Sequence, residues 1–363
     1  MSGGFVPWRW IESGPARRRD TRKAPMPRRS RHRPCRIAVM LMAALLGSAC
    51  SVVGGHAERQ PPPEPELDTL RIGVTDSIDA VCLRLGVAQG LFARRGVDVE
   101  MVEHATRSGA LDALEDGDVD LALADNVSVL TGAAEGVRYE FQGEAYLAGA
   151  ATMALMTMPG AGEDGETEDE DPVEPEGRIP MHQPRIGVGP DADLGRLATH
   201  SLLATEGIEH DEITFVEDDF AGLMRALAGT ELDAVWLEEP RINTAQREYG
   251  ATVLADAARG PMRDFPVSSY VTTSDTAEAY PETFALFRSL LERSQALGSD
   301  PTLIRGSLPD FTSIDATAAA LVALGSFPTV LNTGRLQRVA DLMHATGMLD
   351  EQLDVAAMVP GDE

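Results

Sequence analysis

Strand-like and helix-like hydrophobic patterns alternate along residues 70–124. The segment opens with the apolar strand Leu70-Arg71-Ile72-Gly73-Val74, which runs into the polar turn Thr75-Asp76-Ser77. The positions that follow predict a helix, a short second strand, another helix and a third strand in the run Gly117-Asp118-Val119-Asp120-Leu121-Ala122-Leu123-Ala124. Strands and helices in this order, with short connections, predict an α/β fold with a largely parallel sheet. The strands are expected at 70–74, 97–102 and 117–124, the first helix at 80–92, and the second helix from the end of the turn at 106–109 to about residue 115.

The alternation continues with a helix at 127–136 and a strand pair at 139–142 and 151–158, which we assign to the same lobe. It then stops at residues 161–177, which contain nine Asp or Glu in 17 positions. Such a run cannot bury a core, which predicts a solvated, mobile loop where the chain passes to a second lobe. Cation binding is the alternative role, but the run lacks the ligand spacing of an EF-hand.

From residue 185 onward the pattern predicts a second α/β lobe and then C-terminal helices. The roughly 290 residues after residue 67 are enough for two lobes, each with its own core. Strands are expected at 185–188, 212–216, 232–237 and 252–256, helices of the second lobe at 193–206, 220–228 and 241–249, and C-terminal helices at 281–297, 314–324 and 335–346.

The N-terminal residues have the pattern of an export signal. Ten Arg and one Lys in the first 36 residues precede an apolar run at 37–49, which ends at Cys50. The run is shorter than the about 20 residues that span a bilayer, which favours a signal over a spanning helix. Leu46-Gly47-Ser48-Ala49-Cys50 resembles a bacterial lipobox, in which the Cys thiol receives diacylglycerol. A simple cleaved signal with Cys50 as a bystander is the alternative, and a start at Met26 would give a signal of more usual length.

A tether and a single cysteine follow the signal. Residues 51–67 include Pro61-Pro62-Pro63 and Pro65, and at about 3.1 Å per residue in the polyproline II form they reach roughly 50 Å from the membrane. Cys82 is the one cysteine of the predicted folded part, so we expect no internal disulfide. Its apolar helical surroundings predict a buried, unreactive thiol.

Several short passages carry a resemblance to a known family. They are the strand at 70–74, Gly90-Leu91-Phe92, the run at 117–124 and, in the second lobe, Asp233-Ala234-Val235-Trp236-Leu237-Glu238-Glu239-Pro240. In order and spacing they resemble the periplasmic binding proteins for nitrate, alkanesulfonates, taurine and thiamine pyrimidine precursors, over roughly residues 70–347. The resemblance implies a two-lobed periplasmic-binding-protein type II fold, in which each lobe is a largely parallel sheet flanked by helices and the ligand cleft lies between the lobes.

The resemblance also implies that C-terminal segments return to the first lobe, and it gives a division of the whole chain. We expect a signal peptide at 1–49, the lipidated Cys50 and a Pro-rich tether at 50–67, the first part of lobe one at 68–160, an acidic disordered loop at 161–180, lobe two at 181–262, and a crossover with C-terminal helices at 263–358.

Charge excludes one class of partner. Residues 1–49 carry 11 basic and 2 acidic side chains, so the remainder has 20 Arg against 56 Asp and Glu, a net charge of −36. Phosphate backbones require basic surface, which argues against nucleic acid. Contact with an anionic membrane must therefore come through the lipid anchor. A salt-tolerant or strongly GC-biased bacterium explains the acidity, and calcium buffering is the alternative.

An absent residue type argues against catalysis. No lysine follows Lys23, so the exported part cannot form a Schiff base with pyridoxal phosphate or supply the Lys of a phosphate-binding loop. Part of the resembled family consists of pyrimidine synthases that act on a bound pyridoxal cofactor. The His residues are scattered, with no metal-binding spacing. We therefore expect no enzyme activity, no cofactor and no metal.

Polar residues at predicted strand ends and helix starts are the candidate ligand contacts. Ligands of α/β sheets bind beyond the carboxyl ends of the strands, where helix N-termini favour anions. Helix capping is the alternative role for each Ser, Thr, Asp or Asn, and core packing is the alternative for Trp236. The candidates are Thr75, Asp76, Ser77, Thr106, Arg107, Ser108, Asp125, Asn126, Pro190, Asp191, Trp236, Glu238, Glu239, Ser269 and Tyr270.

Five residues of this set carry a carboxylate, whereas Arg107 is its one basic residue. This balance favours an amine-bearing or hydrogen-bonding heterocycle over a small anion, with Trp236 and Tyr270 as an aromatic platform.

We therefore expect a monomeric solute-binding lipoprotein on the outer face of a bacterial cell membrane. It would capture a small polar ligand, for example an aminopyrimidine, a thiamine precursor or another nitrogen- or sulfur-containing compound, and deliver it to an ABC permease. A ligand-sensing or scaffolding module for a membrane receptor is the alternative, and an enzyme of pyrimidine synthesis is a further one that the missing lysine disfavours.

Overall fold

The computed structural model describes residues 64–159 and 183–361. The predicted signal, the predicted lipidation site Cys50, most of the predicted tether and the acidic segment lie outside the described residues. In the described part of the chain, no helix combines the length and apolar character needed to cross a membrane.

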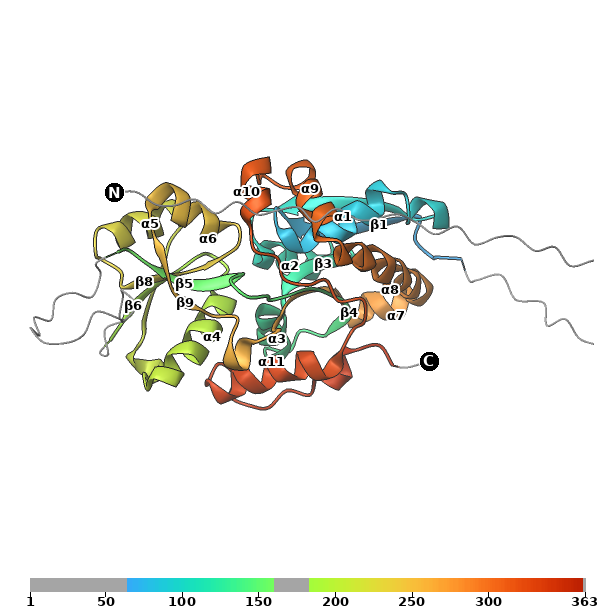
Figure 1. Ribbon diagram of the computed structural model, residues 1–363. Coiled ribbons are helices and arrows are strands. Elements are labelled where there is room, and N and C mark those ends of the chain that lie inside the picture. Colours follow the sequence, from blue (N-terminus) through green and yellow to red (C-terminus); the bar gives the residue numbers. More distant parts are fainter. Residues whose placement is uncertain (1–63, 160–182, 362–363) are drawn as a thin grey trace, which may run out of the picture. The chain divides into compact units, whose positions relative to one another are not determined.

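The first lobe contains a five-stranded mixed sheet in the order β2-β1-β3-β10-β4 (Figure 1). β1 pairs in parallel with both β2 and β3, whereas β10 runs antiparallel to both β3 and β4. Every residue of β3 is buried, as expected of a central strand that is covered on both faces. The strands are β1 (Thr69–Thr75), β2 (Asp98–His104), β3 (Leu121–Asp125), β4 (Tyr139–Leu147) and β10 (Pro266–Thr273).

The second lobe repeats this arrangement in the order β7-β6-β8-β5-β9. β6 is parallel to β7 and β8, and β5 is antiparallel to β8 and β9. The two-lobed α/β fold expected from the sequence is confirmed, with one reversed strand in each sheet. The strands are β5 (Met153–Thr157), β6 (Arg185–Val188), β7 (Thr214–Glu217), β8 (Ala234–Glu238) and β9 (Thr252–Asp256).

The predicted strand at 151–158 was assigned to the wrong lobe. Residues 151–158 were expected to pair within lobe one, but β5 joins the second sheet through β8 and β9. The chain therefore leaves lobe one at 148–152, and the segment between β5 and β6 connects two strands of lobe two instead of two lobes. The apolar pattern of residues 153–157 identifies a buried strand but carries no information on its partner.

Helices cover both faces of each sheet (Figure 1). The helix expected at 314–324 is shorter, and the helices at 274–279 and 301–311 were not expected. Lobe two carries α4 (Ala192–Leu203), α5 (Phe220–Ala228) and α6 (Arg241–Thr244), which a π-helical turn extends over Ala245–Tyr249. The other helices are α1 (Val81–Ala88), α2 (Arg107–Glu115), α3 (Asn126–Ala134), α7 (Ser274–Ala279), α8 (Pro281–Gln295), α9 (Pro301–Phe311), α10 (Ala316–Leu321) and α11 (Thr333–Ala345).

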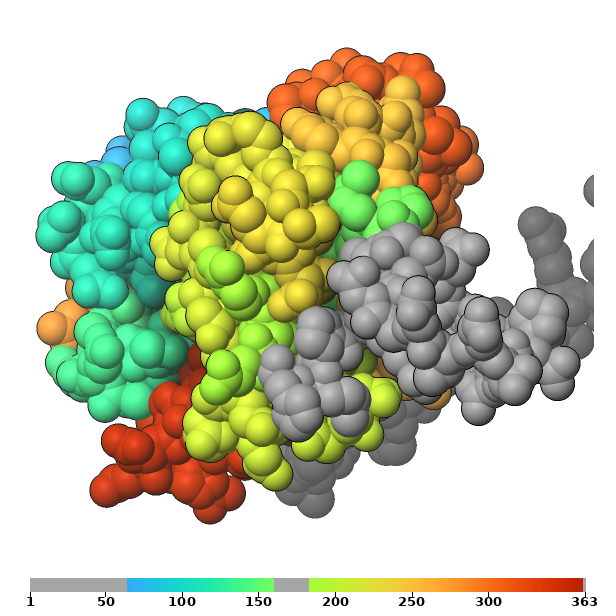
Figure 2. Space-filling view, turned by 90° about the vertical axis from the view of Figure 1, so that its left-hand side faces the viewer, coloured from blue at the N-terminus to red at the C-terminus, as the bar shows by residue number. Residues whose placement is uncertain are grey.

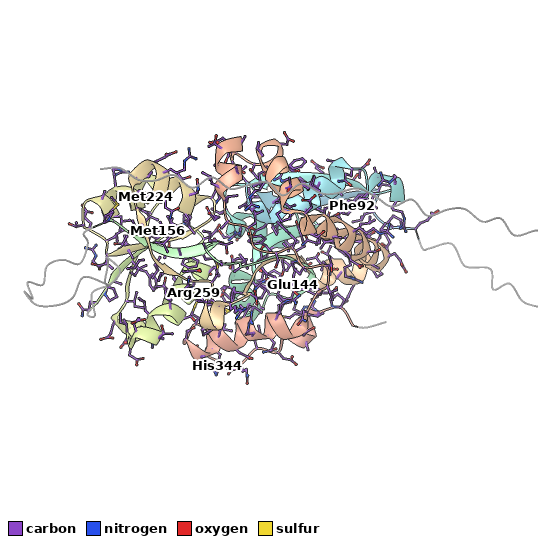
Figure 3. All side chains as sticks on the ribbon, in the orientation of Figure 1. Phe92, Glu144, Met156, Met224, Arg259 and His344 are labelled. Atoms are coloured by element: carbon purple, nitrogen blue, oxygen red, sulfur yellow. The ribbon has the colours of Figure 1, made fainter. Side chains whose placement is uncertain are left out.

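Each lobe has its own apolar packing. In lobe one, Phe287 of α8 lies between Phe92 and Tyr270, with ring centroids 6.1 Å and 5.8 Å away. In lobe two, Met156 of β5 and Met224 of α5 are fully buried in one cluster (Figure 3). The core of lobe one therefore reaches from α8 through the reversed strand β10.

Two linkers, 148–152 and 257–265, connect the lobes. They contact each other where the N–H of Ala148 donates to the carbonyl of Phe265 at 2.8 Å, and the second linker begins beside β5, where the N–H of Ala257 donates to the carbonyl of Met153 at 2.9 Å. A C-terminal segment lies along the first linker through a bridge between Leu147 and Ser326. Viewed from the lobe-two side, residues of lobe two lie in front of lobe one and of the C-terminal segments (Figure 2).

A close approach of backbones fixes this C-terminal segment on the linker. A Cβ on Gly325 would lie 2.0 Å from the carbonyl oxygen of Leu147, and a Cβ on Gly149 would lie 2.9 Å from the Cα of Gly325. Only glycine fits at either position without moving the backbone.

Candidate functional site

A cavity of about 180 Å³ lies between the two lobes. The turns that line it follow β1 and β2 in lobe one and β6 and β8 in lobe two, at the carboxyl ends of parallel strands. This is where α/β sheets bind ligands. The lining residues are Thr75, Asp76, Ser77, Asp79, Ala105, Thr106 and Arg107 from lobe one and Gly189, Pro190, Asp191, Trp236, Leu237, Glu238, Glu239, Pro240 and Arg241 from lobe two.

Two hydroxyl groups in the cavity wall lack partners. Thr75 ends β1 and is only 7% exposed, yet its Oγ1 has no hydrogen-bond partner. The Oγ of Ser77, in the turn that follows, is also buried and unpartnered. Since buried polar groups are normally hydrogen-bonded, these two hydroxyls are suited to binding a ligand.

Arg107 is the central cation of the site. It is the first residue of α2, and Thr106 caps this helix by accepting a hydrogen bond from the N–H of Gly109 at 3.0 Å. The guanidinium forms ion pairs with Asp79 at 3.3 Å and with Glu238 of the other lobe at 3.1 Å. Burial alone would lower the pKa of Arg107, but the charges of Glu238, Asp79 and Asp125 outweigh it and raise this pKa. Arg107 is therefore firmly charged and already neutralised.

Asp191 of lobe two sits at the N-terminus of α2 in lobe one. Its Oδ2 accepts from the backbone N–H of Arg107 at 2.9 Å. Its Oδ1 accepts from the backbone N–H of Ser108 at 3.2 Å and from the Ser108 hydroxyl at 3.0 Å. One carboxylate thus takes up three donors at a helix N-terminus, a position that favours negative charge.

Two further acidic side chains, Asp79 and Asp125, interact electrostatically with Arg107. The Ser268 hydroxyl donates to Asp79 at 2.6 Å, which holds the partner of Arg107 in place. Asp125 caps α3 by accepting from the N–H of Ser128 at 2.9 Å. Burial raises the pKa of Asp125 to about 6, although the bond from Ser128 and the charge of Arg107 act in the opposite direction.

Two further carboxylates of the cavity hold C-terminal backbone. Glu239 accepts from the N–H of Ala323 at 3.0 Å and from that of Asn243 at 3.2 Å, while burial raises its pKa. Asp76 accepts from the N–H of Ser313 at 2.9 Å. The C-terminal segments are therefore bound to both walls of the cavity.

Comparison with protein families adds to this geometry. Residues 63–303 match the model of the NMT1-like family. The chain belongs to this family. A comparison with curated protein sequences finds no match.

This NMT1-like chain is also similar in fold to solved structures of binding proteins. The alkanesulfonate-binding protein SsuA from Xanthomonas axonopodis pv. citri, bound to MOPS, has 18% identity and a TM-score of 0.63, with 81% of this chain and 99% of that chain covered. The aliphatic sulphonate binding protein SsuA from Escherichia coli has 16% identity and a TM-score of 0.63, covering 82% and 93%. The nitrate-binding protein NrtA from Synechocystis PCC 6803 has 12% identity and a TM-score of 0.62, covering 82% and 86%.

At these identities the structural neighbours show the fold alone. Together with the family match, they confirm the resemblance to the nitrate and sulfonate binding proteins at the level of family and fold. The lipid anchor, the ligand and the contact residues stay predictions.

The structure brings ten of the fifteen candidate residues of this family member together at the cavity. The ten are Thr75, Asp76, Ser77, Thr106, Arg107, Pro190, Asp191, Trp236, Glu238 and Glu239. Trp236 also serves the core, since it is 5% exposed and packs on Gly195 of α4.

The other five candidates do not line the cavity. Ser108 is occupied by Asp191, Asp125 caps α3, and the Nδ2 of Asn126 donates to the carbonyl of Pro266 at 2.8 Å. Ser269 and Tyr270 are fully buried. Tyr270 packs on Phe287 in the core of lobe one, so its expected role as an aromatic platform for the ligand is wrong in this conformation.

Sequence reasoning missed two charged residues of the site. Asp79 lies in a short 3-10 turn, Ile78–Ala80, just after the polar turn that ends β1. Arg241 begins α6 directly after Pro240, and its guanidinium lies 5.8 Å from the ring centroid of Phe220. Both residues closely follow segments that were recognised as candidate ligand contacts, and this position was the signal in the sequence that could have identified them. In the described residues, no group of His, Cys, Asp and Glu is arranged to hold a metal ion.

Proposed function

We propose that this protein is the solute-binding component of an ABC importer. The observation that carries the proposal is the cavity between the lobes, lined from both sides and containing the unpartnered hydroxyls of Thr75 and Ser77. A small polar ligand that contacts both walls would bind the closed arrangement more tightly than an open one. Such differential affinity shifts the population toward the closed state, which a permease can recognise.

The paired linkers at 148–152 and 257–265 support this mechanism. Each is short, and each lies between a strand of one sheet and a strand of the other. A rotation of one lobe against the other therefore requires backbone changes at these two places only, which is typical of hinge closure. The C-terminal contacts at Asp76 and Glu239 would change with the same rotation.

The membrane location rests on the sequence. The basic N-terminal region, the apolar run at 37–49 and Cys50 support export and lipid anchoring on the outer face of the cell membrane. The Pro-rich tether would leave the binding unit free to approach a permease.

The size and charge of the cavity support one class of ligand. A cavity of about 180 Å³ suits a small compound. Its carboxylates and hydroxyls suit a nitrogen-containing heterocycle such as an aminopyrimidine or thiamine precursor better than nitrate.

A ligand panel with two matched variants tests the proposal. The thermal midpoint of the purified protein would be measured with aminopyrimidines, thiamine, taurine, alkanesulfonates, nitrate, polyamines and amino acids. Ligand at 100 times its Kd adds about 2.7 kcal/mol, which corresponds to roughly 5 °C or more at this size. A shift for one chemical class is expected, and no shift for any compound would count against a solute-binding role.

Thr75→Val and Tyr270→Phe distinguish the cavity from the core. Both remove a buried hydroxyl without a partner, so neither should reduce stability appreciably. Thr75→Val should weaken ligand binding by about 2- to 10-fold, the equivalent of one hydrogen bond, because Thr75 lines the cavity and its hydroxyl has no partner in the protein. Tyr270→Phe should leave the affinity unchanged. Equal effects of the two variants would contradict the assignment of the cavity as the ligand site.

A further inference from the structure

The N-terminus of α2 is a position that an anionic ligand could occupy, and we call it the anion seat. In this structure the carboxylate of Asp191 fills it. Backbone N–H groups at a helix N-terminus form a ready anion-binding site, and α2 presents those of Arg107 and Ser108 toward lobe two. The carboxylate of Asp191 accepts from both N–H groups and from the Ser108 hydroxyl. An incoming sulfonate or nitrate would have to displace this carboxylate or lie against it.

The other positive group at this place is also occupied. The guanidinium of Arg107 pairs with Asp79 and with Glu238, and its side chain is 11% exposed. It therefore has little charge left to offer an anion. A group that carries its own positive charge would instead meet carboxylate oxygens.

The charge of the cavity wall agrees with this geometry. Five carboxylates face two guanidinium groups, so the wall has an excess of three acidic groups when all are ionised. The acidic groups are Asp76, Asp79, Asp191, Glu238 and Glu239, and the basic groups are Arg107 and Arg241.

A separate observation indicates that the cavity is built for a ligand. The Oγ1 of Thr75 is buried in the wall without a hydrogen-bond partner, and this residue is 7% exposed. A hydroxyl oxygen can accept a hydrogen bond from an ammonium or amino group. The wall thus offers an acceptor beside the carboxylates.

We propose that Asp191 determines the charge of the ligand: by filling the anion seat of α2 it excludes anions and selects a small organic cation. The inference rests on the proposed solute-binding function and deepens it. The class of ligand is a protonated amine or an amino-substituted heterocycle. The same carboxylate also connects the two lobes, so its role is tied to the closed arrangement.

Asp191→Ala tests the inference, with Asp193→Ala as its matched control. Asp191 is the N-cap of α4 and Asp193 lies in the first turn of this helix, where it accepts from the hydroxyl of Ser128 on α3 at 3.4 Å instead of from the N-terminus of α2. Both variants remove one negative charge from α4. Calorimetric titrations of the purified proteins would use methanesulfonate, sulfate and nitrate as anionic probes, and methylammonium, putrescine and 4-aminopyrimidine as basic probes.

The wild-type protein should bind at least one basic probe, and methanesulfonate at least tenfold more weakly. Asp191→Ala should gain at least tenfold in methanesulfonate or sulfate affinity, whereas Asp193→Ala should behave as wild type. Tighter binding of an anion than of every basic probe by the wild-type protein would overturn the inference and leave the proposed function standing. Equal anion affinity of the two variants would also overturn it.

Asp191→Asn serves where Asp191→Ala fails to fold. It keeps the shape of the side chain and removes its charge, so a smaller gain in anion affinity is expected, and no gain would overturn the inference. Absence of binding by any probe to the wild-type protein would count against the proposed function. Even then, new anion binding in either Asp191 variant would support the inference, because the seat on α2 does not depend on the natural ligand.

Discussion

Arg107 of lobe one and Glu238 of lobe two form an ion pair of 3.1 Å across the cavity. The same guanidinium lies 3.3 Å from Asp79 of its own lobe, and both contacts are largely withdrawn from water. One cation therefore neutralises a carboxylate on each side of the cleft, and its loss would affect both walls.

Replacing Arg107 with Met should lower the free energy of unfolding by about 3 kcal/mol or more, because it leaves Asp79 and Glu238 without a partner. Combining Arg107→Met with Asp79→Asn should recover part of this loss, since one of the two stranded charges is then removed. Urea denaturation of the wild-type protein and both variants measures the effect. Stability equal to that of the wild-type protein in Arg107→Met would contradict the prediction.

Asp125 should make the protein less stable as the pH rises from about 4 to 6. Its pKa is raised by burial to about 6 in the folded protein, above the ordinary value of 3.8 for an aspartate, so the folded state binds more protons in this interval. The stability it contributes is fully present below pH 4 and is lost as the pH passes the folded pKa. Asp125→Asn keeps the cap on α3 without this titration.

The difference in unfolding free energy, Asp125→Asn minus wild type, should therefore increase by about 2 kcal/mol between pH 4 and pH 7. Using the difference removes the contribution of the other carboxylates, which titrate in both proteins. A difference that stays constant with pH would show that the carboxylate is not held in this environment.

Glu239→Ala should lower both the free energy of unfolding and the affinity for the ligand. Both carboxylate oxygens accept backbone N–H groups, those of Ala323 and Asn243, and truncation leaves these donors unpaired. A loss of about 1–3 kcal/mol in unfolding free energy is expected. Glu248→Ala, which removes an exposed carboxylate of the same lobe, serves as the control and should lie within about 0.5 kcal/mol of wild type.

Cys82 should not react with thiol reagents in the folded protein. The side chain is fully buried on α1, and burial raises the pKa of its thiol to about 12. Only the thiolate is the nucleophile, so both access and ionisation prevent the reaction. Alkylation at pH 8 followed by peptide mass spectrometry should leave Cys82 unmodified without denaturant and modified in guanidinium chloride. Rapid modification under native conditions would contradict its burial.

The hydrophobic pattern of the sequence predicted where strands and helices lie better than it predicted which strands pair with each other. The apolar runs at 70–74 and 117–124 are central strands, because a sheet covered on both faces needs continuous apolar sequence. The same reasoning found β5 but placed it in lobe one, since its pairing with β8 depends on residues some 80 positions away. Helix α9 was missed although Asp300 caps it and Pro301 begins it, which are recognisable start signals.

The candidate site shows the same limit. Turns at strand ends were informative because parallel strands bring their carboxyl ends to one edge. Tyr270 was misplaced because β10 is covered on both faces, and alternation along a strand does not tell which face meets the cleft. The contacts of Asp191 with α2 could not be foreseen, because they depend on how two lobes close on each other.

The reversed strand of lobe one has a consequence for biosynthesis. β10 lies between β3 and β4, yet it follows every strand of lobe two in the chain. While the polypeptide emerges, from either a ribosome or a translocon, β3 and β4 therefore have a gap between them until residue 273 has appeared. The first lobe to be synthesised is the last to be completed, and an exported chain held unfolded until its end has been delivered avoids exposing those unpaired strand edges.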